Sequence, residues 1–264
     1  MLGQPDAFYE ADGGLFRPSE LTRGPWDEGS QHAGPVAALI AGELERVPTP
    51  DDAGMRLGRI TYEILRPVPI APLRIGTWVE RDGRRIQMLG ASLHSGDDEV
   101  IRARAWRLRT NEVEIPGDLA PDPPSHRPAD GEERDFFATG AEVGYHTAVE
   151  YRFVDGAWLE PGPATVWMRA RVPVVAGRDV SPLQRVMVVA DSGNGVSATL
   201  DWRRFLFINV DLTVNLHRYP AGEWVCLDAT TVPERDGIGL ADALLMDERG
   251  PIGRAAQTLL VAER

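Results

Sequence analysis

The sequence contains no lysine, and all 28 of its basic residues are arginine. This absence excludes enzymes that form a Schiff base on lysine, pyridoxal-phosphate enzymes that hold their cofactor in this way, and the phosphate-binding loop that needs a lysine. The 40 acidic residues bring the net charge to −12. Because binding to phosphate backbones needs a basic field, this balance argues against a general nucleic-acid binder.

Cysteine is almost as scarce, since Cys226 is the only one in the chain. A single cysteine excludes an internal disulfide and a cysteine-rich zinc site. The five histidines form neither HxH nor HxxxH, which disfavours a metal site. The sequence also lacks the GxSxG of a serine hydrolase and the third glycine of a dinucleotide-binding motif. We therefore expect no metal and no cofactor.

Long apolar runs are missing too: no stretch approaches the roughly 18 to 20 apolar residues of a membrane span. The first residues, MLGQPDAFYEADGG, carry acids and glycines where a secretion signal needs a basic start and an apolar run. A cytoplasmic protein is the simplest expectation. With 43% apolar residues in 264, the chain is expected to fold as one large domain or two fused small ones.

The one strong shift in composition lies at residues 111–135, which are crowded with proline and acidic residues. Such a segment favours an extended, exposed linker. It divides the chain into residues 1–110 and 136–264, and we expect each part to form one domain.

The two parts repeat one order of elements. Gly34 and Pro35 open a helical pattern in the first, and Ser181 and Pro182 supply an N-cap and a first-turn proline in the second. Strand patterns follow each helix, at residues 59–65, 74–81, 85–94 and 100–109, and at residues 207–218, 223–232, 239–247 and 252–263, while 146–154 and 165–172 precede the second helix. This order predicts an α+β fold in which an antiparallel sheet wraps one helix in each part, with the two sheets joined edge to edge.

Three segments resemble the double hotdog fold of the thioesterase-like superfamily, specifically the type II acyl-CoA thioesterases: SPLQRVMVVADSGNG, FINVDLTVNLHR and RAAQTLLVAER. The resemblance covers most of residues 14–110 and 145–264. It implies that Asp191, after the helix, is the catalytic aspartate and that Gln257 is the catalytic glutamine. Asn209 stands where the best-known members have Thr or Ser.

Aligning the two halves places apolar residues at all three of these positions in the first half. Leu44 falls opposite Asp191, Leu57 opposite Asn209 and Ala105 opposite Gln257. The alignment therefore predicts one working site, in the second half, and a degenerate one in the first. Read singly, Asp191 is more often a capping acid followed by a turn at SGNG, so the prediction depends on the three residues together.

Four further residues are candidates for substrate binding. His32 and Gly34 lie at the start of the first helix, and Arg203 and Arg204 stand beside aromatic residues, where they could pair with the phosphates of CoA. A polar loop residue without a ligand and a solvated arginine pair are the alternatives.

The predicted function is hydrolysis of an acyl-CoA thioester to a free acid and CoA. Asp191 would deprotonate a water that Asn209 and Gln257 hold in place. One alternative is a non-catalytic acyl-CoA or lipid-binding protein. Another is an enoyl-thioester hydratase or dehydratase, which relies on an Asp and His pair and is disfavoured because no histidine is expected near Asp191. The sequence leaves open a homo-oligomer and the length of the acyl chain.

Overall fold

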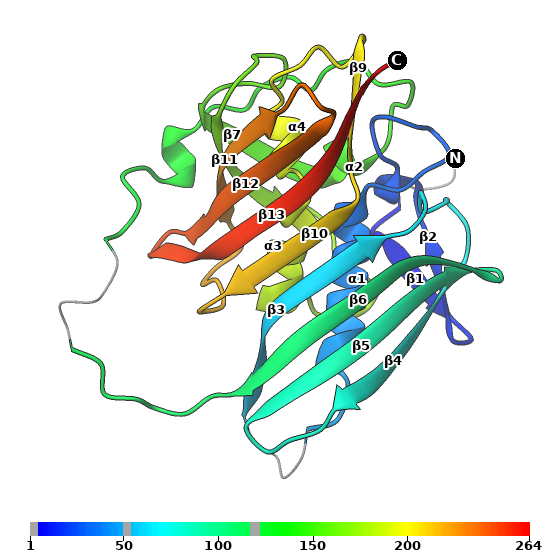
Figure 1. Ribbon diagram of the computed structural model, residues 1–264, viewed down its shortest axis with the longest axis vertical. Coiled ribbons are helices and arrows are strands. Elements are labelled where there is room, and N and C mark those ends of the chain that lie inside the picture. Colours follow the sequence, from blue (N-terminus) through cyan, green and yellow to red (C-terminus); the bar gives the residue numbers. More distant parts are fainter. Residues whose placement is uncertain (1–4, 50–53, 117–121) are drawn as a thin grey trace.

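The computed structural model describes residues 5–49, 54–116 and 122–264 (Figure 1). The elements of the first half are β1 (Tyr9–Asp12), β2 (Leu15–Pro18), η1 (Glu20–Thr22), α1 (Ala33–Glu45), β3 (Met55–Ile64), β4 (Leu73–Arg81), β5 (Ile86–Ser95) and β6 (Asp98–Arg109). Those that follow are η4 (Pro128–Asp130), α2 (Tyr145–Ala148), β7 (Val149–Asp155), β8 (Ala164–Ala170), α3 (Pro182–Ala190), α4 (Gly193–Val196), β9 (Phe205–Asn209), β10 (Asp211–Leu216), β11 (Val225–Pro233), β12 (Ile238–Asp247) and β13 (Gly250–Glu263).

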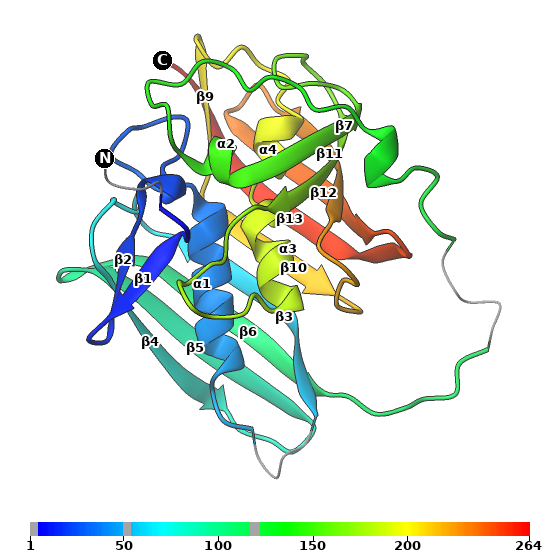
Figure 2. The same ribbon diagram turned by 180° about the vertical axis from the view of Figure 1, so that it is seen from behind.

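The strands form one 13-stranded sheet in the order β1-β2-β4-β5-β6-β3-β10-β13-β12-β11-β8-β7, with β9 paired to β13. The pairings between the named strands are antiparallel. Helices α1 and α3 lie side by side on one face of this sheet, as Figure 2 shows. The predicted fold class, α+β with two helix-wrapped antiparallel sheets, is therefore confirmed.

The two halves join where β3 pairs with β10. Thr61 lies opposite Thr213, and the two hydroxyl oxygens are 3.2 Å apart. On either side of this pair, Glu63 faces Asp211 and Arg59 faces Asn215. No sheet edge is left exposed at the junction, as the repeated order of elements predicts.

The two central helices are capped differently. Ser181 caps α3 as predicted: its hydroxyl accepts from the backbone N–H of Gln184 at 3.1 Å, and the side chain of Gln184 accepts from the N–H of Ser181. Helix α1 begins one residue before Gly34, and its cap is the imidazole of His32, whose Nδ1 lies 3.0 Å from the N–H of Gly34. The cap therefore places a titratable ring at the start of α1.

Three local expectations are corrected. The strand expected at 207–218 is interrupted at Val210, where the chain leaves β9 and enters β10, because the side chain of Asp211 takes the N–H of Thr258 out of the ladder. The segment 146–154 begins with the short helix α2 before β7. The SGNG run, expected as a turn, instead supplies the N-cap Ser192 and the first three residues of α4.

The linker is only partly as expected. Residues 111–116 are exposed and lack regular structure. Farther along, the imidazole of His126 accepts a hydrogen bond from the indole of Trp167 at 3.1 Å, and Pro128 is buried. The second part of the linker is thus attached to the outer strands of the second half.

Helices α1 and α3 run antiparallel and touch closely. A Cβ atom at Gly34 would overlap the carbonyl oxygen of Val188, near the end of α3. Farther along α1, the side-chain amide of Gln184 donates to the carbonyl of Ala38 at 3.2 Å. Because the contact is antiparallel, the start of α1 lies against the end of α3.

We predict that Gly34→Ala destabilises the protein. The added methyl meets backbone, which must shift, and such overpacking typically costs about 1–3 kcal/mol of the free energy of unfolding. For a chain of this size that corresponds to a fall in Tm of roughly 2–12 °C. The control is Gly195→Ala, where an added Cβ meets nothing within 4 Å. Equal Tm values for the two variants in thermal unfolding would contradict the close contact.

Candidate functional site

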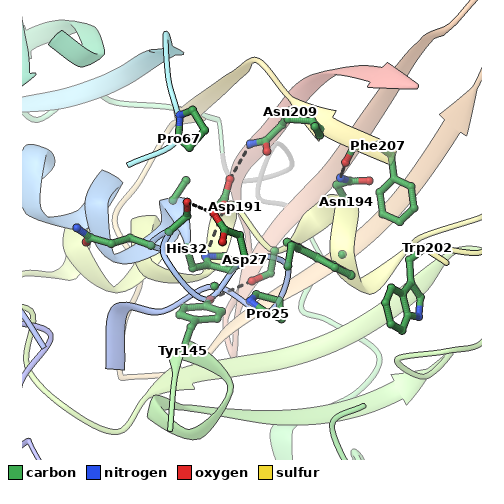
Figure 3. Close-up of a pocket in the computed structure, with 18 of the residues that line it drawn as sticks. Pro25, Asp27, His32, Pro67, Tyr145, Asp191, Asn194, Trp202, Phe207 and Asn209 are labelled. Carbon is green, nitrogen blue, oxygen red and sulfur yellow. Dashed lines mark hydrogen bonds and ion pairs between the residues drawn. The ribbon is translucent and has the colours of Figure 1, made fainter. Parts of the chain in front are cut away.

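The ends of the two helices bring His32 and Asp191 together (Figure 3). Asp191 is the residue that ends α3, and its Oδ2 lies 3.2 Å from Nδ1 of His32. The expectation that no histidine lies near Asp191 is therefore wrong. The two residues belong to different halves, and the antiparallel contact of α1 with α3 is what joins them.

Two amide side chains hold the other carboxylate oxygen of Asp191. Oδ1 accepts from Nδ2 of Asn209 at 2.9 Å and from Nε2 of Gln257 at 3.1 Å. Asn209 is the last residue of β9, and Gln257 belongs to β13, so the three residues come from one helix end and two strands. The structure thus brings together the three side chains that the sequence singled out.

The hydrogen bonds of Gln257 do not match its expected part in holding a water. Its Nε2 lies 3.1 Å from both the carbonyl oxygen and Oδ1 of Asp191, while its Oε1 accepts from the N–H of Asn194 at 3.1 Å. Gln257 is 2% exposed, and its amide is taken up by these protein groups. It therefore positions Asp191.

Burial shapes the electrostatics of the pair. The side chains of Asp191 and His32 are 7% and 12% exposed. Loss of hydration lowers the pKa of His32 below its usual value, and the negative charge of Asp191 opposes this by raising it. Atom Nδ1 accepts from the N–H of Gly34 when it carries a lone pair and donates to Asp191 when it carries a proton. The position of one proton on His32 therefore changes what Asp191 contacts.

Tyr145 completes the cluster, and sequence reasoning missed it. Its ring stacks on the imidazole of His32, with ring centroids 3.7 Å apart and planes at 10°. Its hydroxyl donates to the carbonyl of Val188 at 2.8 Å and lies 2.9 Å from the hydroxyl of Ser192. Burial raises the pKa of Tyr145, so the phenol stays neutral. The sequence offered no signal for it, because it directly precedes the segment 146–154, whose pattern predicts a strand.

A cavity of about 450 Å³ opens beside this cluster. His32, Tyr145, Asp191 and Asn209 line it, together with residues of the loop at 24–31 and of β9. Most of the lining surface is apolar. A few polar groups thus lie together in an otherwise apolar cleft, which is the usual arrangement of a small-molecule site.

The other predicted binding residues do not line this cavity. Gly34 packs against α3, while Arg203 and Arg204 are exposed beside the rings of Trp202 and Phe205. Two other arginines, Arg66 and Arg264, are exposed and do line the cavity. Which arginines reach the cavity depends on how the chain folds. The aromatic neighbours of Arg203 and Arg204 in the sequence do not reveal this.

The equivalent positions of the first half are apolar and buried. Thr61 pairs with Arg104 in the first half and Thr213 with Ala256 in the second, so Ala105 takes the register position of Gln257. Leu57 likewise precedes Thr61 by four residues, as Asn209 precedes Thr213, and Thr61 and Thr213 face each other at the junction. Leu44, near the end of α1, is fully buried, and Leu57 and Ala105 are 2% and 0% exposed. The first half therefore lacks the polar triplet.

Within the ranges that the structure describes, no three acidic, cysteine or histidine side chains gather as metal ligands would. Nor does any helix there have the length and apolarity needed to cross a bilayer.

Solved structures similar to this chain show the same fold. A presumed thioesterase II of Thermobifida fusca YX is 16% identical, with 97% of each chain covered and a TM-score of 0.75. A hot dog fold protein of unknown function from Alicyclobacillus acidocaldarius is also 16% identical over 97% of each chain, with a TM-score of 0.72. The acyl-CoA thioesterase II TesB2 of Mycobacterium marinum is 13% identical, covers 97% of this chain and 94% of its own, and has a TM-score of 0.66.

Family comparison assigns both halves. No protein of curated function matches the sequence. Residues 22–108 match the acyl-CoA thioesterase N-terminal domain, and residues 116–261 match the acyl-CoA thioesterase C-terminal domain. With both matched segments lying on one continuous sheet, the chain belongs to the acyl-CoA thioesterase family and has its two-domain hotdog fold.

Proposed function

We propose that the protein hydrolyses acyl-CoA thioesters, with Asp191 as the general base. The observation that carries this proposal is the way in which hydrogen bonds hold the Asp191 carboxylate beside the cavity. Two amides hold its Oδ1, while the residue itself lines an apolar cavity. A carboxylate held in this way beside a cavity supports a role as general base toward a water bound there.

The reaction follows from these positions. Asp191 accepts a proton from water as the water oxygen bonds to the thioester carbonyl carbon. When the tetrahedral intermediate collapses, the carbon–sulfur bond breaks, and the proton held by Asp191 passes to the departing thiolate of CoA. Asn209 and Gln257 act through Asp191 by fixing Oδ1, which leaves Oδ2 to exchange the proton.

The protonation of His32 determines whether Oδ2 of Asp191 can contact a water. While His32 is neutral with its proton on Nε2, its Nδ1 accepts from the N–H of Gly34 and leaves Oδ2 of Asp191 for water. Once protonated, His32 pairs with Oδ2 at the 3.2 Å separation and competes with the water. Burial in the site lowers the pKa of His32, which keeps the imidazole neutral near pH 7.

Arg66 and Arg264 are the cations that we assign to the CoA phosphates. They are exposed where they line the cavity, and an acidic chain of net charge −12 needs local positive charge to attract an anionic ligand. Arg203 and Arg204 lie in the neighbouring segment, and the backbone N–H of Arg264 donates to the carbonyl of Arg204. They extend the same positive surface.

The contact of His32 with Asp191 favours a second candidate, hydration of an enoyl thioester. An imidazole and a carboxylate within 3.2 Å form the acid–base pair that such a reaction uses. The two activities are distinguished by their products, because hydrolysis releases free thiol and hydration removes the conjugated double bond. An assay that reads both signals on the same enoyl-CoA decides between them.

We predict that Asp191→Asn lowers kcat/KM for thioester hydrolysis about a hundredfold or more, because the amide keeps the shape but cannot take the proton. The control is Asp228→Asn, since Asp228 is an exposed acid on β11. Release of free thiol is the readout, and CoA binding is measured in parallel. Full activity in Asp191→Asn would mean that another residue is the base.

Asn209→Ala and Gln257→Ala are expected to lose roughly tenfold each, the usual effect of removing one hydrogen bond to a charged group. Their losses should not add in the double variant, because both side chains donate to the same oxygen. The measurement is a double-mutant cycle on kcat/KM. Additive losses would show that the two amides act at separate points.

The pKa of His32 gives a test that needs no substrate. Burial lowers it below the usual 6.5 and Asp191 raises it, so Asp191→Asn should lower it further. Because the neutral form is favoured in the folded protein, His32 supports stability at pH values above its unfolded pKa, and this support is lost as the pH falls below 6.5. Titration of the imidazole by NMR measures the shift, with Asp228→Asn as the control. A His32 pKa that rises in Asp191→Asn would contradict the contact.

A further inference from the structure

The imidazole of His32 has a ring N–H that no protein group takes up. Its Nδ1 accepts from the backbone N–H of Gly34 at 3.0 Å, so the single proton of the neutral ring lies on the other nitrogen, Nε2. Within the described part of the chain no hydrogen bond involves Nε2, and this atom is not one of the buried polar atoms without a partner. Because His32 lines the cavity, its Nε2–H is open to a ligand there.

Three contacts fix the direction of this N–H. The N–H of Gly34 and the carboxylate of Asp191, whose Oδ2 lies 3.2 Å from Nδ1, hold one edge of the ring. Tyr145 stacks on its face, with ring centroids 3.7 Å apart and planes at 10° (Figure 3). A donor that is held in place beforehand needs no reorganisation during a reaction, which is what makes it effective toward a developing charge.

The other side-chain donors around Asp191 already have acceptors. The hydroxyl of Tyr145 donates to a backbone carbonyl at 2.8 Å. The amide of Gln257 donates to the backbone carbonyl and to Oδ1 of Asp191, and that of Asn209 donates to Oδ1 as well. Of these donors, the Nε2–H of His32 is the one with no acceptor among the described residues.

We propose that the Nε2–H of His32 donates to the thioester carbonyl oxygen and stabilises the negative charge that develops on it. This inference rests on the proposed thioester hydrolysis and adds the donor which that reaction needs besides its base. One ring carbon separates Nε2 from Nδ1, and Nδ1 lies 3.2 Å from Oδ2 of Asp191. A single thioester group can therefore meet a water on Oδ2 and a donor at Nε2 together.

The surroundings of His32 suit this part. The ring caps α1, a helix of 13 residues, and the start of a helix carries partial positive charge that favours an anionic oxygen. Loss of hydration lowers the pKa of His32, so the ring is neutral near pH 7 and donates from Nε2 while Oδ2 of Asp191 stays free for water. A neutral imidazole is able to polarise a carbonyl group in this way.

His32 moves no proton in this step. As the water oxygen bonds to the carbonyl carbon and loses a proton to Asp191, an electron pair of the C=O bond moves onto the carbonyl oxygen. The hydrogen bond from Nε2 is stronger to this charged oxygen than to the neutral carbonyl, so it favours the transition state over bound substrate. When the pair returns, the carbon–sulfur bond breaks, the thiolate takes the proton from Asp191, and His32 is unchanged.

Two variants separate the donor from the helix cap. His32→Asn supplies a polar atom near the place of Nδ1, a good N-cap, but has no donor at the place of Nε2. His32→Gln reaches one carbon farther and keeps an N–H there, but it is a poor cap. We expect kcat to fall about 100-fold in His32→Asn, the usual loss for one such donor, and to stay at least roughly tenfold higher in His32→Gln. Thermal unfolding should rank them the other way, with the higher Tm in His32→Asn.

The assay measures free thiol from acetyl-CoA, octanoyl-CoA and phenylacetyl-CoA, and kcat is compared on the ester that the wild type cleaves fastest. His94→Asn is the matched control, because His94 lies on β5 outside the cavity. If His32 served only as a cap, or if a backbone N–H at the start of α1 were the donor, His32→Asn would be at least as active as His32→Gln. That order would overturn the proposal and leave thioester hydrolysis intact.

Binding tests the same hydrogen bond without turnover. S-trifluoroacetonyl-CoA carries a ketone that adds water to give a tetrahedral adduct resembling the intermediate. Its Kd should rise about 100-fold in His32→Asn, in parallel with the loss of kcat, whereas the Kd of CoA should not change. Nitrogen-15 NMR of the free wild type should place the imidazole proton on Nε2 near pH 7, and a proton on Nδ1 would contradict the proposal.

If the wild-type protein releases no thiol from any of the three esters, the proposed function fails, and the role of His32 is judged by binding alone. Weaker binding of S-trifluoroacetonyl-CoA, but not of CoA, in His32→Asn than in His32→Gln then supports a donor at Nε2 to a carbonyl oxygen. Equal binding of this analogue by the two variants overturns it.

Discussion

The close contact between the start of α1 and the end of α3 is the constraint on which the site depends. Only a glycine at position 34 lets the backbone of α1 approach the carbonyl of Val188. Because the two helices approach this closely, His32, which caps α1, reaches Asp191, which ends α3. The same carbonyl also accepts from the hydroxyl of Tyr145, so one helix end organises packing and chemistry together.

The two halves share one fold, but only the second half carries the polar residues around Asp191. A sheet joined at β3 and β10 places the two halves about a common junction, with Thr61 facing Thr213. Asp191, Asn209 and Gln257 then each have a counterpart in the first half, and those counterparts are Leu44, Leu57 and Ala105. An apolar residue at each counterpart adds to the buried core of the first half, where an unpaired amide or carboxylate would cost stability. One half can therefore specialise in packing while the other keeps the buried polar cluster.

Much of this could be predicted from the sequence, because the repeated order of helix and strands reflects local periodicity. Asp191, Asn209 and Gln257 followed from the resemblance of three segments to the type II acyl-CoA thioesterases, a likeness that local stretches of sequence carry. The features that the sequence did not predict depend on contacts between distant parts of the chain. His32 meets Asp191 only through antiparallel helix packing, the break at Val210 needs the side chain of Asp211 in the ladder, and Arg66 reaches the cavity from the other half.

The aromatic residues of the cavity walls also could not be brought together from the sequence alone. Trp26, Phe137, Trp158 and Trp202 come from four loops that lie outside the repeated strands, and they meet through tertiary contacts such as the stack of Trp26 on Phe137 at 5.3 Å. The repeated elements hold the buried polar cluster around Asp191 in place, whereas these loops define the shape and polarity of the space beside it. Since loops change more readily than the sheet that carries them, the same polar cluster can stand beside cavities of different shape. The walls therefore decide which ligands fit beside Asp191, and the polar cluster does not.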